Sequence, residues 1–148
     1  MKRNRIVLVV ALAMFVASFF CASAMGSSKF ITTSEFSGWF CAYVTLLMPW
    51  SHDPSLNHSL LGNMALLFSG LINPIFLVTV VLMIRERAPR LVNALRIVLL
   101  LMLPSCWVVF LDQHIWPRYG YFLWVAAILL VLFSGSFSNQ AVALQTRK

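Results

Sequence analysis

Histidine and aspartate residues supply the most reactive side chains of this 148-residue chain. Imidazole and carboxylate groups are common ligands of zinc, copper and iron, so a metal site is one hypothesis for them. No pair has the His-x3-His or HExxH spacing that places two ligands on one helix turn. We therefore interpret them as polar loop residues, predict no cofactor, and keep the metal site as an alternative. The residues concerned are His52, Asp53, His58, Asp112 and His114.

The cysteines Cys21, Cys41 and Cys106 form no CxxC pair. A Cys21–Cys41 disulfide is one alternative, but we favour buried apolar thiols, because free cysteine is commonly buried. The chain also lacks the GxSxG, Walker and GxGxxG motifs that serve nucleophilic and nucleotide chemistry. The sequence therefore predicts a protein that is not an enzyme.

Four long apolar runs must position these groups, at residues 6–25, 60–84, 91–111 and 119–137. Each is close to the roughly 20 residues that cross a bilayer core as a helix. With 61% hydrophobic and 10% charged residues, the composition excludes an ordinary soluble domain. We predict an all-α fold, in which a four-helix bundle forms a single membrane domain over residues 1–148.

Lysine and arginine residues lie almost entirely on one side of these runs. With the N-terminus inside, only Lys29 and Arg118 of the eleven basic residues fall outside. This positive-inside pattern predicts a multi-pass protein of a bacterial inner membrane with both termini in the cytoplasm. The net charge of +7 then meets lipid head groups and does not indicate nucleic-acid binding. The inside residues are Lys2, Arg3, Arg5, Arg85, Arg87, Arg90, Arg96, Arg147 and Lys148.

The first run also resembles a signal peptide. It has a basic start, an apolar stretch over residues 6–20, and a small-x-small pattern at Ala22-Ser23-Ala24. The whole apolar run at residues 6–25, about twenty residues, is longer than the usual signal-peptide core, so we favour a retained anchor helix.

A shorter apolar stretch at residues 33–48 lies between the first two runs. Thr32 and Glu35 have the spacing of a capping box, and Pro49 ends the stretch. As a helix it would span only about 20 Å, too short to cross the bilayer core. We predict an amphipathic helix in the outer interface; a fifth span would move the C-terminus outside and disrupt the charge pattern.

Prolines and polar residues interrupt the apolar runs. Pro74 and Pro104 each remove a helical hydrogen bond, and Asn73 is placed to bond across helices or to the broken ladder. Two interrupted helices occur in some transporters, but no inverted repeat is visible, so we interpret these residues as packing features. Arg96 lies close enough to the inner surface to extend its side chain toward it.

Large aromatic residues dominate the outward segments. Trp39, Tyr43, Trp50 and Trp116 are rigid groups of the kind that anchor protein interfaces, although an interfacial aromatic belt would look similar. We predict a non-enzymatic protein that binds a protein partner or self-associates, either an immunity protein against a membrane-acting toxin or an accessory subunit of an envelope complex. The alternative is a metal- or quinone-linked redox or transport protein that uses the outer histidine, aspartate and tryptophan residues.

Two segments carry a family resemblance. Gly-Leu-Ile-Asn-Pro-Ile-Phe-Leu at residues 70–77 and Gly-Tyr-Phe-Leu-Trp at residues 120–124 resemble a group of small uncharacterised bacterial inner-membrane proteins with four spans. The resemblance covers about half of the chain and implies a bacterial origin and the four-span layout. It assigns no activity and no catalytic residues.

The charge pattern makes a direct prediction about topology. A reporter that is active only in the periplasm is expected to be active when fused after Ser27 and inactive when fused after Arg87 or Lys148. The reason is the cost of translocating the arginine cluster between the second and third runs. Activity of the fusion at Lys148 would require an odd number of spans and would contradict the prediction.

Overall fold

A computed structural model describes residues 2–28, 31–47, 60–112 and 114–134, and the chain is mostly helical, as predicted. The predicted residues Trp50, His52, Asp53 and His58 lie outside the described residues. The elements are α1 (Lys2–Phe20), β1 (Ala22–Ser28), β2 (Ile31–Ser37), α2 (Gly38–Leu47), α3 (Leu60–Ile84), α4 (Pro89–Met102), α5 (Ser105–Asp112), β3 (Ile115–Pro117) and α6 (Tyr119–Phe133).

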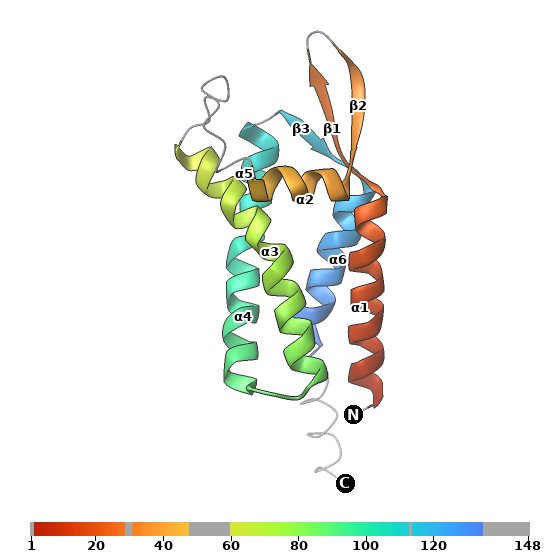
Figure 1. The fold of residues 1–148 in the computed structure, drawn as a ribbon, viewed down its shortest axis with the longest axis vertical. Coiled ribbons are helices and arrows are strands. Elements are labelled where there is room, and N and C mark those ends of the chain that lie inside the picture. The colour runs from red at the N-terminus through yellow and green to blue at the C-terminus, as the bar shows by residue number, and fades with distance from the viewer. Residues whose placement is uncertain (1, 29–30, 48–59, 113, 135–148) are drawn as a thin grey trace.

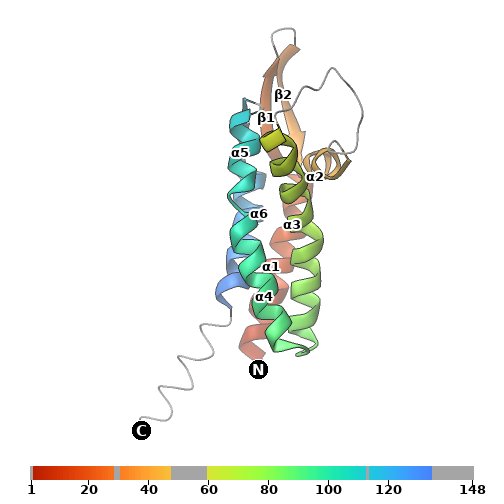
Figure 2. The same cartoon turned by 90° about the vertical axis from the view of Figure 1, so that its left-hand side faces the viewer.

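The helices α1, α3, α4 and α6 stand side by side, and α5 continues the line of α4 (Figures 1 and 2). At one end of this bundle, which we call the sheet end, the strands project and α2 lies across the helices (Figure 1). The other end, which we call the basic end, carries the turn between α3 and α4 with Arg85, Arg87 and Arg90. Helix α1 packs most extensively on α6, and α3 on α4 and α5.

The core between the helices is aliphatic and aromatic. Phe15 of α1 stacks on Phe76 of α3 with ring centroids 4.4 Å apart. Leu99 of α4 and Ile128 of α6 are fully buried in the same cluster. Every long helix therefore contributes to one continuous core.

Pro104 divides the third apolar run, as the sequence predicts. Helix α4 ends at Met102 and α5 begins at Ser105. The proline ring cannot donate a hydrogen bond to the preceding turn. The hydroxyl of Ser105 instead donates to the carbonyl of Met102 at 2.6 Å. Pro74, in contrast, lies inside α3 without ending it.

A small antiparallel sheet, with strand order β2-β1-β3, was not predicted. Met25 pairs with Glu35 of β2 on one side and with Trp116 of β3 on the other. The prediction that residues 21–25 extend the first helix is therefore wrong, because α1 ends at Phe20. Strand β1 can form because the long-range partner β3 satisfies its second edge.

Helix α2 begins at Gly38, five residues later than predicted, so the capping box at Thr32 and Glu35 is wrong. Residues 31–33 are Ile-Thr-Thr, and β-branched residues favour an extended backbone. Both predicted box residues lie in β2. Ser37 caps the helix in their place, since its hydroxyl accepts a bond from the Phe40 N–H at 3.4 Å.

Glycines allow the sheet end to sit directly on the bundle. A Cβ on Gly38 would lie 2.3 Å from the Ser18 carbonyl oxygen of α1, and a Cβ on Gly70 would lie 2.8 Å from the Thr45 carbonyl oxygen of α2. At Gly120 of α6, a Cβ would meet the Ala22 carbonyl oxygen of β1 at 2.8 Å. Backbone thus contacts backbone at three junctions, where no other side chain fits.

Substitution of Gly70 tests this close approach. In an ordinary helix, Gly→Ala stabilises by up to roughly 1 kcal/mol. Here we expect Gly70→Ala to lower the free energy of unfolding by about 1–3 kcal/mol, because α2 must move away from α3. Denaturant unfolding of the detergent-purified protein measures the change.

Asn63→Ala serves as the control, because Asn63 is exposed on the same helix. Its expected effect is within about 0.5 kcal/mol. A Gly70→Ala protein as stable as wild type would show that α2 does not rest on α3.

Candidate functional site

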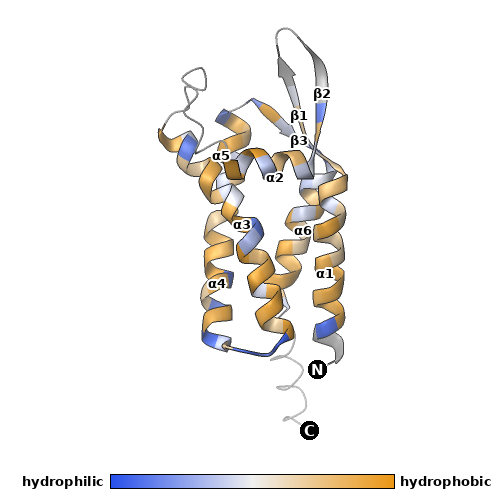
Figure 3. Ribbon diagram, viewed as in Figure 1, coloured by the Kyte–Doolittle hydropathy of each residue, from blue (hydrophilic) through white to orange (hydrophobic). Residues whose placement is uncertain are grey.

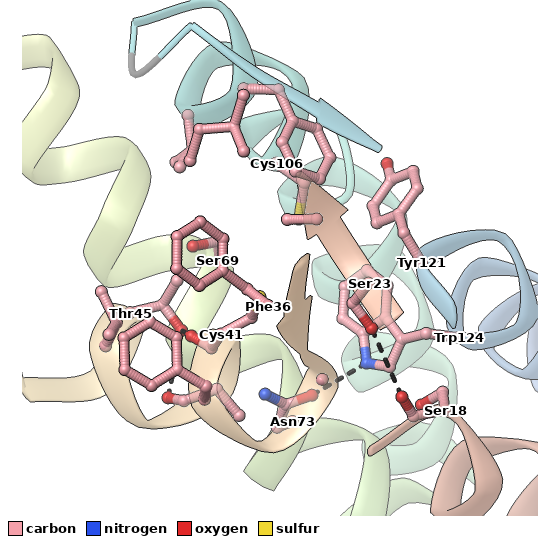
Figure 4. A pocket seen from close by; sticks show the side chains of 18 of the residues that line it. Ser18, Ser23, Phe36, Cys41, Thr45, Ser69, Asn73, Cys106, Tyr121 and Trp124 are labelled. Carbon is pink, nitrogen blue, oxygen red and sulfur yellow. Dashed lines mark hydrogen bonds between the residues drawn. The ribbon is translucent and has the colours of Figure 1, made fainter. Parts of the chain in front are cut away.

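A cavity of about 330 Å³ lies between α2 and the rest of the sheet end (Figure 4). Its walls come from helices α1, α2, α3, α5 and α6 and from the three strands. Its volume falls in the range of small-molecule pockets, roughly 300–1,000 Å³. The cavity is partly open. It is therefore large enough for the ring of an organic ligand.

Aromatic side chains form much of the wall, and none of the described residues that line the cavity is charged. Tyr121 packs edge-on against Phe110 with ring centroids 4.8 Å apart and lies 5.9 Å from Trp124. Phe36 stacks on Phe40 at 5.3 Å. The aromatic lining residues are Phe19, Phe36, Phe40, Phe110, Tyr121 and Trp124.

Asn73 joins two walls of the cavity. The indole N–H of Trp124 donates to Asn73 Oδ1 at 2.9 Å, which confirms the expectation that this amide bonds across helices (Figure 4). The amide nitrogen of Asn73 points away from Trp124, and no hydrogen bond to it occurs among the described residues. The two N–H groups of the Asn73 amide are thus available to a ligand at the cavity wall.

Most hydroxyl groups of the wall already donate to the backbone. Ser69 donates to the Leu66 carbonyl at 2.8 Å, and Thr45 donates to the Cys41 carbonyl at 2.9 Å. The Tyr121 hydroxyl differs, because it makes no hydrogen bond to the lining side chains drawn in Figure 4. Among the described lining residues, Tyr121 and Asn73 therefore supply the O–H and N–H donors that are not already used.

Two thiols also line the cavity, from Cys41 of α2 and Cys106 of α5. All three cysteines are free, so the Cys21–Cys41 disulfide does not form. Burial raises the pKa of the Cys41 thiol to about 11. At neutral pH this thiol is almost fully protonated, and it is therefore a poor nucleophile and a poor metal ligand.

Arg118 ties the sheet to the bundle. It lies at the start of α6, and its backbone N–H donates to the Ser23 carbonyl at 3.0 Å. Its guanidinium donates to the Met25 sulfur at 2.7 Å and lies 3.7 Å from a Glu35 carboxylate oxygen. Sequence reasoning identified Arg118 only as an exception to the charge pattern and missed this structural role.

The predicted metal ligands do not form a site in the described part of the chain. Among these residues, no group of three His, Cys, Asp or Glu side chains is placed to hold an ion. Asp112 ends α5, and His114 follows it exposed, with a positive φ of 51°. The metal hypothesis at His52, Asp53 and His58 concerns residues outside the described range.

The predicted aromatic surface is exposed where it is described. Trp39, Tyr43 and Trp116 expose 67%, 58% and 71% of their surface. Trp39 and Tyr43 lie one turn apart on α2, whereas Trp116 lies on β3. We call these three residues the aromatic surface.

Arg96 does not belong to either site. Its Nη2 donates to the Val131 carbonyl at 2.6 Å and to the Ser134 hydroxyl at 2.8 Å. It therefore neutralises the carbonyl end of α6, where a cation is favoured by the helix dipole. This cross-helix contact was not predicted.

Comparisons with protein-family models, with curated proteins and with solved structures found no match. The function is therefore inferred from the chemistry of the cavity and of the aromatic surface.

Proposed function

We propose that this chain is a four-span protein of a bacterial inner membrane, a single membrane domain with both termini in the cytoplasm, whose sheet end faces the periplasm and binds a protein partner. Two stretches, Leu60–Ile84 and Pro89–Asp112, are long and apolar enough to cross a membrane. Helices α1 and α6 stand beside them along the same axis (Figures 1 and 2). A bilayer that covers α3 and α4 therefore also surrounds α1 and α6.

The outer faces of the helices support this placement. Large apolar residues are exposed on them, such as Ile97 and Leu101 of α4 and Phe122 of α6. Apolar colour predominates along the helices, which contain a few hydrophilic positions in α3 and α4, and the turn between α3 and α4 is strongly hydrophilic (Figure 3). Soluble monomers rarely expose continuous apolar surface on this scale, so contact with lipid explains it.

The charges support one orientation. Arg5 of α1 lies 3.5 Å from Glu86 in the turn between α3 and α4, which places both at the basic end. Arg85, Arg87 and Arg90 are exposed at the same end. By the positive-inside rule this end faces the cytoplasm. The layout is the one implied by the resemblance to small four-span inner-membrane proteins.

The observation that carries the binding role is the construction of the sheet end. The segment between α1 and α3 and the segment between α5 and α6 join in one sheet, and glycine contacts fix this sheet and α2 to the bundle. The aromatic surface therefore stands on a preorganised support, which lowers the entropic cost of binding. An immunity-type protein or an accessory subunit of an envelope complex requires such a rigid outward face.

Site-specific photo-crosslinking in living cells tests the partner. A photoreactive residue in place of Trp39, Tyr43 or Trp116 is expected to give a protein adduct of one defined mass. The same residue at Leu101 or Phe122 should label lipid, because these positions face the bilayer in the proposed layout. Adducts at the aromatic surface that contain only lipid would contradict partner binding.

Paired substitutions then measure the contribution of the aromatic surface. Trp39→Ala with Trp116→Ala is expected to cost about 2 kcal/mol or more of binding free energy, roughly a thirtyfold loss of affinity. Leu101→Ala with Phe122→Ala removes exposed apolar groups from the bundle and should leave affinity unchanged. Equal affinity of both double variants would remove the aromatic surface from the interface.

A further inference from the structure

We propose that the cavity beneath α2 binds the head group of a lipid-soluble quinone. This inference uses the membrane placement proposed above but is independent of the protein partner, because the cavity and the aromatic surface do not share residues. Three features of the described lining residues support it: they carry no charge, several are aromatic, and two have unused hydrogen-bond donors.

The walls select a neutral ligand. No lysine, arginine, histidine, aspartate or glutamate occurs among the described residues of the lining. A charged ligand would lose part of its hydration there without gaining an ionic partner from these residues, which is unfavourable. The described lining residues thus offer no ionic partner to a phosphate or ammonium head group, whereas an uncharged ring needs none.

The aromatic residues select a flat ligand. Phe36 of β2 lies across the cavity from Tyr121 and Trp124 of α6 (Figure 4), and Phe40 of α2 also lines it. Aromatic side chains interact best with another π-system in offset-stacked or edge-on geometry. A saturated acyl chain would contact the same walls but would gain none of this directional attraction.

The two available donors select carbonyl acceptors. The amide nitrogen of Asn73 and the hydroxyl of Tyr121 both lie on the lining, and neither makes a hydrogen bond to the lining side chains drawn in Figure 4. Each of them can donate a hydrogen bond to a ligand that presents an acceptor. A quinone ring presents two carbonyl oxygens, and it is flat and neutral.

The position and volume of the cavity fit a molecule that arrives from the bilayer. A cavity of about 330 Å³ that is partly open accommodates the ring and leaves an isoprenoid tail outside. Nearby side chains, including Leu46 of α2 and Met64 of α3, expose apolar surface along which the tail can lie. The cavity thus holds the head group at the sheet end of the bundle while the tail stays in lipid.

Photolabelling of the full-length protein in detergent tests the proposal. A quinone with a photoreactive group on its ring is expected to label lining residues of α2 and α6, and unlabelled decylubiquinone should compete to saturation at one molecule per chain. A phosphatidylglycerol with a photoreactive acyl chain is used in a second experiment, which tests whether the cavity binds an acyl chain. Labelling of the cavity by this lipid that decylubiquinone does not displace would overturn the proposal and assign the cavity to an acyl chain.

Two variants identify the site. Ala42→Phe fills the cavity and is expected to weaken quinone labelling by tenfold or more, whereas Leu47→Phe, exposed on the same helix and outside the lining, should not. Tyr121→Phe removes one donor and keeps the ring, so a three- to tenfold loss of affinity is expected, which is roughly the effect of one hydrogen bond.

Tyr119→Phe is the control for the donor, because Tyr119 is exposed and is not part of the lining. Thermal unfolding of each variant separates loss of the site from loss of the fold. The proposal would be overturned if both Tyr121→Phe and Ala42→Phe fold and both bind the quinone with wild-type affinity. Labelling that does not saturate would also overturn it.

Discussion

The pairing of β1 with both β2 and β3 is the constraint on which the sheet end depends. Residues 22–28 follow directly on α1, and their backbone groups need partners once the helix has ended. The hairpin partner β2 is local, whereas β3 comes from the segment before α6. The register in which Met25 faces Trp116 therefore joins the two outward segments and fixes the start of α6 against the end of α1.

The position of α2 follows from this arrangement. The helix begins directly after β2, and the Gly38 N–H donates to the Cys21 carbonyl at 3.0 Å, so its first turn is held beside α1. Its last turns rest on α3 at Gly70. Because it is held at both ends, α2 lies across the bundle and covers the cavity. The cavity is the space that the aromatic residues of α2, α5 and α6 leave unfilled.

Local sequence signals predicted the helices but not the sheet. The apolar runs located α3 and the two parts of the third run, and Pro104 marked the break between α4 and α5. Strand β1 has the sequence Ala-Ser-Ala-Met-Gly-Ser-Ser, which has no alternation of apolar and polar residues and no strong β-former. Its pairing with β3 joins residues about 90 positions apart, and no local pattern encodes such a partner.

The sequence did not predict the cavity either. Its lining residues come from eight separate elements, and each of them alone resembles an ordinary core residue. Asn73 was the one lining residue that the sequence marked as unusual, because an amide within an apolar run requires a hydrogen-bond partner. The sequence predicted its bond across helices, but it did not identify Trp124 as the donor.

An engineered disulfide between β1 and β3 tests the central claim most directly. Opposed residues of antiparallel strands have Cα atoms roughly 4.5–5.5 Å apart, which is within disulfide range. In a chain whose native cysteines are replaced by alanine, Met25→Cys with Trp116→Cys should crosslink within one chain under mild oxidation. The pair Met25→Cys with Arg87→Cys, at opposite ends of the bundle, should not. Failure of the first pair to crosslink would contradict the joined sheet and, with it, the rigid sheet end.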